Sequence, residues 1–117
     1  MPRETSANTA LRFLPARRVK CGVYQFAKFS VKNESAEPIG NLAGFLIDPP
    51  ARKIRFVVVN PRGLFSQPCL VPVPGARLDA EAEALLVDEP LSRCEAFDAS
   101  RYPEVSDEDV ITAVFAA

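Results

Sequence analysis

The sequence has no histidine and no tryptophan, and only three cysteines among its 117 residues. Without histidine the chain lacks the commonest general base, proton shuttle and metal ligand, so Ser–His and Cys–His nucleophilic pairs are excluded. Cys21, Cys69 and Cys94 are too far apart in sequence for the close pairs that disulfide frameworks and zinc sites use. We interpret them as buried structural thiols, with a redox role as the alternative. The sequence therefore predicts a protein that is not an enzyme, with no catalytic residue, cofactor or metal.

Long apolar runs are also absent. None approaches the roughly 20 residues with which a helix crosses a bilayer, and no apolar signal-peptide core is recognisable. Gly40 and Gly44 do not have the spacing of a dinucleotide-binding or phosphate-binding loop. A content of 48% hydrophobic and 25% charged residues is typical of a globular domain. We expect one cytoplasmic domain without a membrane span.

Charge is distributed unevenly along the chain, although the formal net charge is only −1. Residues 1–32 carry seven bases and one acid, whereas residues 79–109 carry eleven acids and two bases. The two ends could be solvated separately, or they could meet within the fold. Alternatively, they could bind each other between copies, or the basic end could bind an anionic partner.

The middle of the chain has the pattern of short strands separated by turns. Residues 29–32 alternate apolar and polar side chains, which is the period of a half-buried strand. Residues 39–48 and 53–60 predict a hairpin around a proline-rich turn, and glycines within the first strand predict bulges. Further short strands are predicted at 68–73, 77–78 and 84–87. Five or six short strands of this kind predict an all-β fold, either a small barrel or a sandwich.

The two ends of the chain differ from this middle part. Residues 1–20 are polar and basic without periodicity, which is typical of an arm, although Leu11 and Phe13 could dock on the core. Ser106 can cap a short helix with an acidic first turn; the acids there fit capping better than cation binding. We expect a basic N-terminal arm at 1–20, a barrel domain at 21–90 and a C-terminal extension with a short helix at 91–117.

Five pieces of the sequence stand in an order that is similar to one known family. Residues 39–48 resemble its apolar-Gly element followed by a strand that ends in Asp, and residues 53–59 resemble its basic-apolar-basic-aromatic strand. Gly63-Leu64-Phe65, Leu70-Val71-Pro72 and Leu85-Leu86-Val87 are similar to its glycine-containing loop, its apolar-Val-Pro segment and its closing strand. Together these pieces resemble the PRC-barrel family.

The resemblance covers about residues 20–110 and implies a small PRC-type β-barrel of five or six short strands with a C-terminal helical extension. In the family the barrel is a docking module, found in the photosynthetic reaction-centre H subunit, in a ribosome maturation factor and in small stand-alone proteins. This chain departs from the family pattern at Ala36 and at 49–52, where the family often has turn glycines, and at Val73, where an aromatic is common. A fold of this kind does not by itself give a function.

Two groups of residues are candidates for partner contact. Leu64 and Phe65 follow a glycine turn and could anchor a protein partner, or they could fold back as a plug. Arg52, Arg55 and Arg62 surround the hairpin; they could form the polar face of a strand, or a site for RNA or an acidic protein.

RNA-binding sheets usually add aromatic side chains for base stacking, and a pI of about 5.5 shows no overall basic footprint, so nucleic acid is disfavoured. We therefore expect a non-catalytic protein-interaction or scaffold module that self-associates as a homodimer or higher oligomer. The alternative hypothesis is a ribosome- or RNA-associated accessory factor, which the basic arm and the hairpin arginines would serve.

Overall fold

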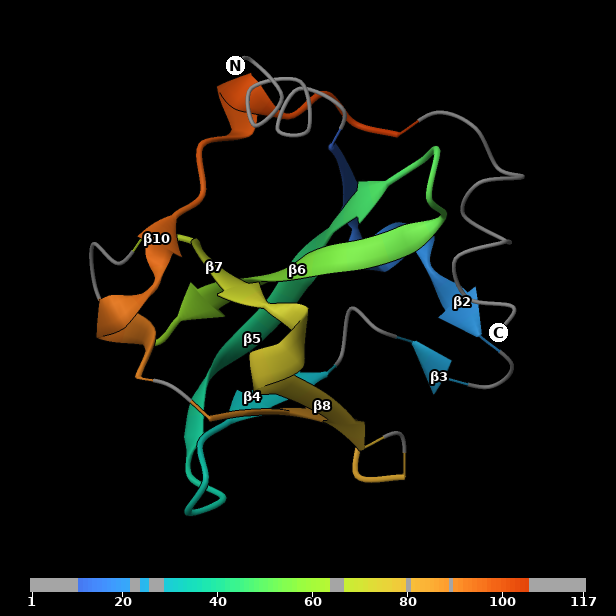
Figure 1. Cartoon of the computed structure of the whole chain (residues 1–117). Helices are drawn as coiled ribbons and strands as arrows, with labels where there is room; N and C mark the ends of the chain where they lie inside the picture. The colour runs from blue at the N-terminus through green and yellow to red at the C-terminus, as the bar shows by residue number, and fades with distance from the viewer. Residues whose placement is uncertain are drawn as a thin grey trace.

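The computed structural model describes residues 11–21, 24–25, 29–63, 67–79, 81–88 and 90–105. About half of these residues form one strongly curved sheet, and β2 and β3 form a separate two-stranded ribbon (Figure 1). The strands are β1 (Arg12–Pro15), β2 (Lys20–Cys21), β3 (Tyr24–Gln25), β4 (Ser30–Lys32), β5 (Pro38–Asp48), β6 (Lys53–Pro61), β7 (Cys69–Pro72), β8 (Ala76–Asp79), β9 (Ala84–Val87) and β10 (Glu95–Ala96). Single 3-10 turns are η1 (Ala16–Arg18), η3 (Val73–Gly75), η4 (Leu91–Arg93) and η5 (Ala99–Arg101).

The two longest strands, β5 and β6, form the centre of the sheet. They pair antiparallel from Gly40–Pro61 to Asp48–Lys53, which confirms the hairpin predicted from the sequence. One edge of β5 pairs with β6 along its length, while the other edge pairs first with β4 and then with β1. The register of β5 against β6 shifts at two points, and such bulges bend a strand. The bent strand β5 thereby joins the part of the sheet that contains β4 to the part that contains β1.

Gly44 lies at the first register shift, where β1 pairs closely with β5. A Cβ atom at this position would lie 2.7 Å from the ring of Phe13 and would overlap the carbonyl oxygen of Leu14. Glycine is therefore needed here because the neighbouring backbone approaches too closely for a side chain.

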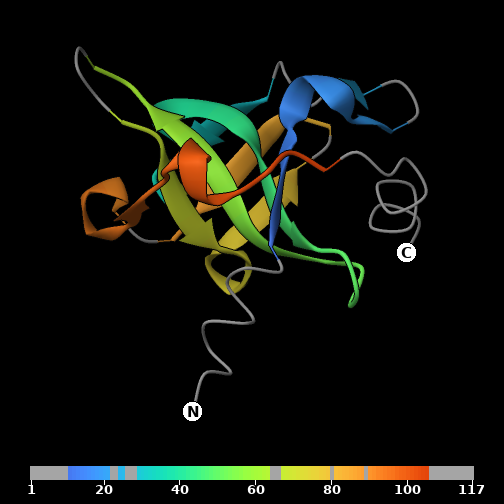
Figure 2. The same cartoon turned by 90° about the horizontal axis from the view of Figure 1, so that it is seen from above.

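Both faces of the central strands are covered. β6 buries Val57 and Val59 in the main core and Val58 in a second cluster, which includes Leu11, Leu46 and Leu70. On the second face, the ring of Phe97 lies 4.9 Å from that of Phe13 and 5.8 Å from that of Tyr102, measured between centroids. Figure 2 shows the last described residues running over the sheet beside β1. Coverage of both faces explains why three consecutive valines are buried.

The predicted closed barrel is a misassignment, because the sheet does not close. The strand order is β10-β7-β6-β5-β4-β9-β8, with β1 on β5, so the path ends at β10 and β8. β10 pairs with β7 through Glu95–Leu70 and Ala96–Cys69 and so occupies its outer edge. β8 therefore pairs with β9 alone within the described residues. Pro72 and Pro74 also lack the N–H groups that would continue β7 past η3.

The rest of the fold-class prediction also needs correction. The described residues contain ten strands instead of five or six, and their helical segments are single 3-10 turns. The predicted C-terminal helix at 106–115 lies outside the described residues. The fold is thus built from strands, as the alternating pattern predicted, but it is an open, curved sheet.

The basic and acidic parts of the chain meet within the fold. Residues 11–19 belong to the segment predicted as an arm, yet β1 lies in the sheet and Leu14 and Val19 are buried. The guanidinium of Arg18 lies 3.0 Å from the carboxylate of Glu104 and donates a hydrogen bond to the carbonyl of Val105. The amide of Val105 in turn donates to the carbonyl of Phe13 at 2.9 Å. These contacts hold 103–105 against β1.

Three turns place a residue other than glycine in the left-handed region, namely Ala36, Arg52 and Glu83, with φ of 64°, 55° and 51°. Each turn is preceded by an Asn or Asp whose side-chain oxygen accepts a backbone N–H bond. Asn33 accepts from Ser35, Asp48 from Ala51, and Asp79 from Ala82. These Asx bonds stabilise the turns and offset the strain of a left-handed residue. They explain how the chain forms tight turns without a glycine at these three left-handed positions.

Candidate interaction surface

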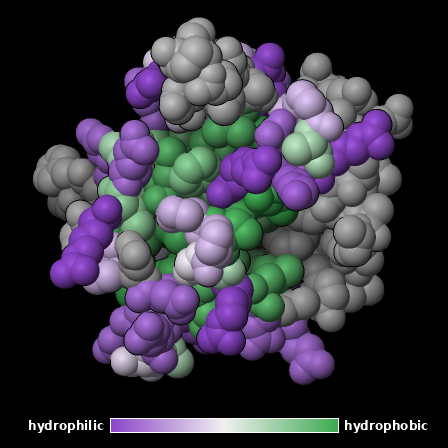
Figure 3. Space-filling view, in the orientation of Figure 1, coloured by the Kyte–Doolittle hydropathy of each residue, from purple (hydrophilic) through white to green (hydrophobic). Residues whose placement is uncertain are grey.

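An apolar hollow of about 200 Å³ opens where the sheet fails to close. Side chains from β5, β6, η3, β8 and β9 line it, among them Ile54, Val73 and Leu78. Figure 3 shows apolar side chains at the surface in the middle of this side of the molecule, between polar groups. An apolar cavity of about 150 Å³ accepts benzene, so the hollow has room for one large apolar side chain.

β8 borders this hollow with an open edge. Its residues pair with β9 from Ala76–Val87 to Asp79–Ala84, and none of the described residues pairs with its other edge. Because side chains alternate along a strand, Ala76 and Leu78 face the hollow, whereas Arg77 and Asp79 lie on the opposite face. The open edge therefore has one apolar and one charged face.

Leu78 is the unusual residue of this edge. It is 51% exposed and stands out as the exposed large apolar side chain of the described residues. Arg77 and Asp79 on either side of it are exposed as well, and within the described part of the chain neither forms an ion pair. One carboxylate oxygen of Asp79 accepts the turn hydrogen bond from Ala82. Opposite charges thus flank an exposed leucine on a free strand edge.

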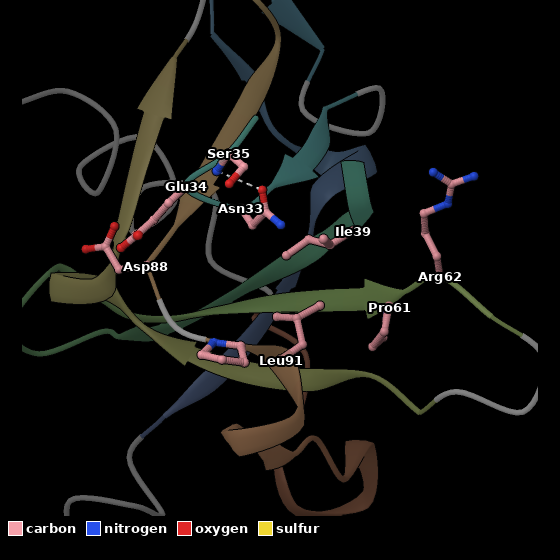
Figure 4. A pocket seen from close by; sticks show the side chains of 9 residues that line it. Asn33, Glu34, Ser35, Ile39, Pro61, Arg62, Asp88 and Leu91 are labelled. Carbon is pink, nitrogen blue, oxygen red and sulfur yellow. Dashed lines mark hydrogen bonds between the residues drawn. The ribbon is translucent and has the colours of Figure 1, made fainter. Parts of the chain in front are cut away.

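Two further hollows share Pro61 and Leu91 and so form one shallow groove, with volumes of about 490 Å³ and 350 Å³. Figure 4 shows the larger of them, with Glu34 and Asp88 at one side and Arg62 at the other. Its charges are mixed, with two acids and one base on the rim, and no charged side chain is buried in it. The groove carries no chemistry that selects a ligand.

The arginines predicted as partner contacts do not gather in one place. Arg52 is exposed in the turn between β5 and β6, and Arg55 forms an ion pair of 3.3 Å with Asp48. Arg62 follows the other end of β6, where it donates to the carbonyl of Pro38 at 3.4 Å. At about 3.3 Å per residue, β6 separates its two ends by roughly 26 Å. Leu64 and Phe65, the predicted apolar anchor, lie outside the described residues.

Cys69 and Cys94 line the smaller hollow of this groove, and neither forms a disulfide. Burial, with a smaller contribution from Cys94, raises the pKa of Cys69 from 9.0 to about 11, so its thiol stays protonated at neutral pH. Ala96 lies directly opposite Cys69, which makes Cys94 a diagonal neighbour. Diagonal residues have Cα atoms about 7–8 Å apart, beyond the usual disulfide range of about 4.4–6.8 Å. The structure thus favours two separate thiols; the side chain of Cys21 is outside the described part.

Other functional signals are few. The described residues include no group of three or more Cys, Asp or Glu side chains that could hold a metal ion, and their core contains no charged or polar side chain. No helix among them is long and apolar enough to cross a membrane. In the comparisons with known proteins, no family model matches the chain and no curated protein matches its sequence. The open edge of β8 is therefore the strongest candidate site.

Proposed function

We propose that the protein is a non-catalytic protein-interaction module that binds through the open edge of its sheet. The observation that carries this proposal is the position of the free β8 edge beside an apolar hollow, with Leu78 exposed. A strand edge presents unpaired N–H and C=O groups that pair readily with a strand of another chain. Burial of the adjoining apolar surface adds a favourable contribution. A partner would add a strand to β8 and cover Leu78.

The partner that we propose for this edge is a second copy of the same chain. Two identical edges can meet about a twofold axis, which gives a closed dimer, the commonest symmetric assembly. Such a dimer would join the two curved sheets at their open ends. The PRC-barrel resemblance agrees with a docking role, because the family's barrels are docking modules; membership and a cytoplasmic location stay predictions.

The alternative, a ribosome- or RNA-associated factor, gains no support from the described surface. Arg52 and Arg62 lie at opposite ends of β6, and Arg55 is paired with Asp48. A nucleic-acid interface needs a continuous basic surface along the phosphate backbone. These arginines do not provide one.

Leu78→Asp in the full chain tests the proposed function. It places a charge where the interface needs an apolar contact, so we expect its dimer dissociation constant to rise at least about tenfold above that of the unchanged protein, as measured by sedimentation equilibrium. Ala99→Asp is the matched control, because it adds the same charge at an exposed position in η5 and should leave the dissociation constant unchanged. A strictly monomeric unchanged protein at millimolar concentration would rule out self-association.

A further inference from the structure

The residues around Leu78 are complementary in charge to a second copy of themselves. Building on the proposed function, we infer that β8 pairs with β8 of a second copy in one antiparallel register, centred on Leu78 and held by two reciprocal Arg77–Asp79 ion pairs. Three observations on the described residues support this register: none of them pairs with the outer edge of β8, Leu78 is exposed, and neither of the opposite charges that flank it forms an ion pair with them.

The register follows from the geometry of antiparallel strands. About a twofold axis through Leu78, the residue before Leu78 in one copy lies opposite the residue after it in the other. Arg77 of each copy therefore faces Asp79 of its partner copy. Side chains that are directly opposite each other lie on the same face, with Cβ atoms about 5 Å apart, close enough for an ion pair. The twofold symmetry therefore creates two Arg77–Asp79 ion pairs.

The other alignments of β8 on itself bring like charges together or leave the charges unpaired. A parallel arrangement places Arg77 beside Arg77 and Asp79 beside Asp79. An antiparallel axis through Arg77 or through Asp79 also places like charges opposite each other. A twofold axis between Arg77 and Leu78 would place each arginine opposite a leucine whose side chain points to the other face, which the pleat of an antiparallel pair does not allow. Only the register centred on Leu78 pairs opposite charges.

The same register also covers the apolar face of the strand. Leu78 and Ala76 of each copy face its hollow, so the two Leu78 side chains meet beside the two hollows on one face of the joined sheet. Each Leu78 loses its contact with water, while the ion pairs form on the opposite face. Both faces of β8 thus gain a contact in one arrangement.

Charged residues on edge strands usually deter pairing. On β8 the signs alternate, so they disfavour the parallel and shifted alignments but favour one antiparallel register. Repulsion in the wrong alignments is a common way to obtain specificity. The charges therefore select the partner and its register, while Leu78 contributes the apolar contact.

A charge-swap experiment on the full chain tests this register. Arg77→Asp and Asp79→Arg each place two pairs of like charges in the interface, and we expect each to raise the dimer dissociation constant at low salt about tenfold or more. The double variant Arg77→Asp/Asp79→Arg restores both pairs with reversed sign, so it should return to within about threefold of the unchanged protein. These differences should shrink in 1 M salt, because exposed ion pairs are screened. Arg17→Asp, an exposed reversal in η1, is the matched control and should leave the constant unchanged.

The outcomes separate this inference from the proposed function. A dimer that Leu78→Asp disrupts but neither charge reversal weakens would mean that the edge is used in a different register, which overturns the inference and leaves the proposed function standing. Single reversals that weaken the dimer without rescue by the double variant would overturn the register in the same way. Far-ultraviolet circular dichroism of each variant shows whether it is folded, as we expect for changes at exposed positions.

Discussion

The centre of the sheet and its open end both contain large apolar side chains but surround them differently. In β6, Val58 and Val59 are fully buried, because strands lie on both edges and residues cover both faces. In β8, the apolar Leu78 is 51% exposed, because within the described residues a strand lies on one edge alone. An apolar side chain thus stabilises the fold in the centre, while at the open end it remains available for a partner. The difference lies in the neighbours of each strand as well as in its composition, because β6 contains three consecutive valines and β8 alternates apolar and charged residues.

Phe29→Ala should have the largest effect on stability. Phe29 is 1% exposed in the main core, so its truncation should lower the free energy of unfolding by about 3–5 kcal/mol. Leu78→Ala is the matched truncation at the open end and should cost less than about 0.5 kcal/mol. Urea unfolding at micromolar concentration, where a weak dimer dissociates, measures both. Similar costs for the two variants would mean that β8 is packed as tightly as the centre.

A pair of glycine substitutions sharpens the same comparison. Gly44→Ala would force a methyl group against Phe13 and Leu14 and should cost about 1–3 kcal/mol. Gly75→Ala, just before β8, meets no atom within 4 Å and should change stability by less than about 1 kcal/mol in either direction. Thermal unfolding of both variants measures these changes in stability. An unchanged stability for Gly44→Ala would contradict the close pairing of β1 with β5.

The effect expected at Cys69, in the strand β7 between β10 and β6, is confined to alkaline pH. Its pKa of about 11 in the folded protein lies above the unfolded value of 9.0, so the folded state holds the thiol proton more tightly. The stability that this proton contributes is complete below pH 9 and is lost as pH rises towards 11. Urea unfolding of the unchanged protein and of Cys69→Ala over this range isolates the contribution as a difference. Equal pH slopes for the two proteins would show that Cys69 is not desolvated.

Alkylation rates report on the same thiol independently. A pKa two units above that of an unperturbed thiol lowers its thiolate fraction about a hundredfold at pH 8. In a Cys21→Ser/Cys94→Ser background, iodoacetamide should therefore modify folded Cys69 at most at about one hundredth of the rate in urea. Comparable rates in the folded and unfolded protein would contradict its burial.

Local patterns predicted much of this fold. The hairpin of β5 and β6 was recognisable from the apolar, glycine-containing run at 39–48, the alternation in 53–60 and the prolines between them. β10 was not predicted from the sequence, because its two residues are too few to show the alternation of a strand. β1 escaped because its four residues lie in a basic segment without alternation. Short strands of this kind are defined by the edge they pair with.

The candidate site was less predictable than the fold. A brief strand at 77–78 was expected, but nothing near Leu78 in the sequence shows that its outer edge is free. Within the described residues β8 stands at one end of the strand order and β10 at the other, an arrangement that only the fold reveals. The hairpin arginines were grouped by their closeness in sequence, yet an extended β6 carries Arg55 and Arg62 apart. The one signal that could have identified the site is the order Arg-Leu-Asp within a predicted strand.

The sequence by itself determined where the main strands and turns lie, because side-chain alternation, proline placement and Asx hydrogen bonds act over a few residues. The tertiary structure decided which strand edges are paired and which remain open. That decision depends on contacts between segments distant in the chain: β10 pairs with β7 at one end of the strand order, whereas β8, at the other end, pairs with β9 alone within the described residues. The pattern along a single strand does not encode which neighbour it meets, so the open edge of β8 follows from the tertiary arrangement.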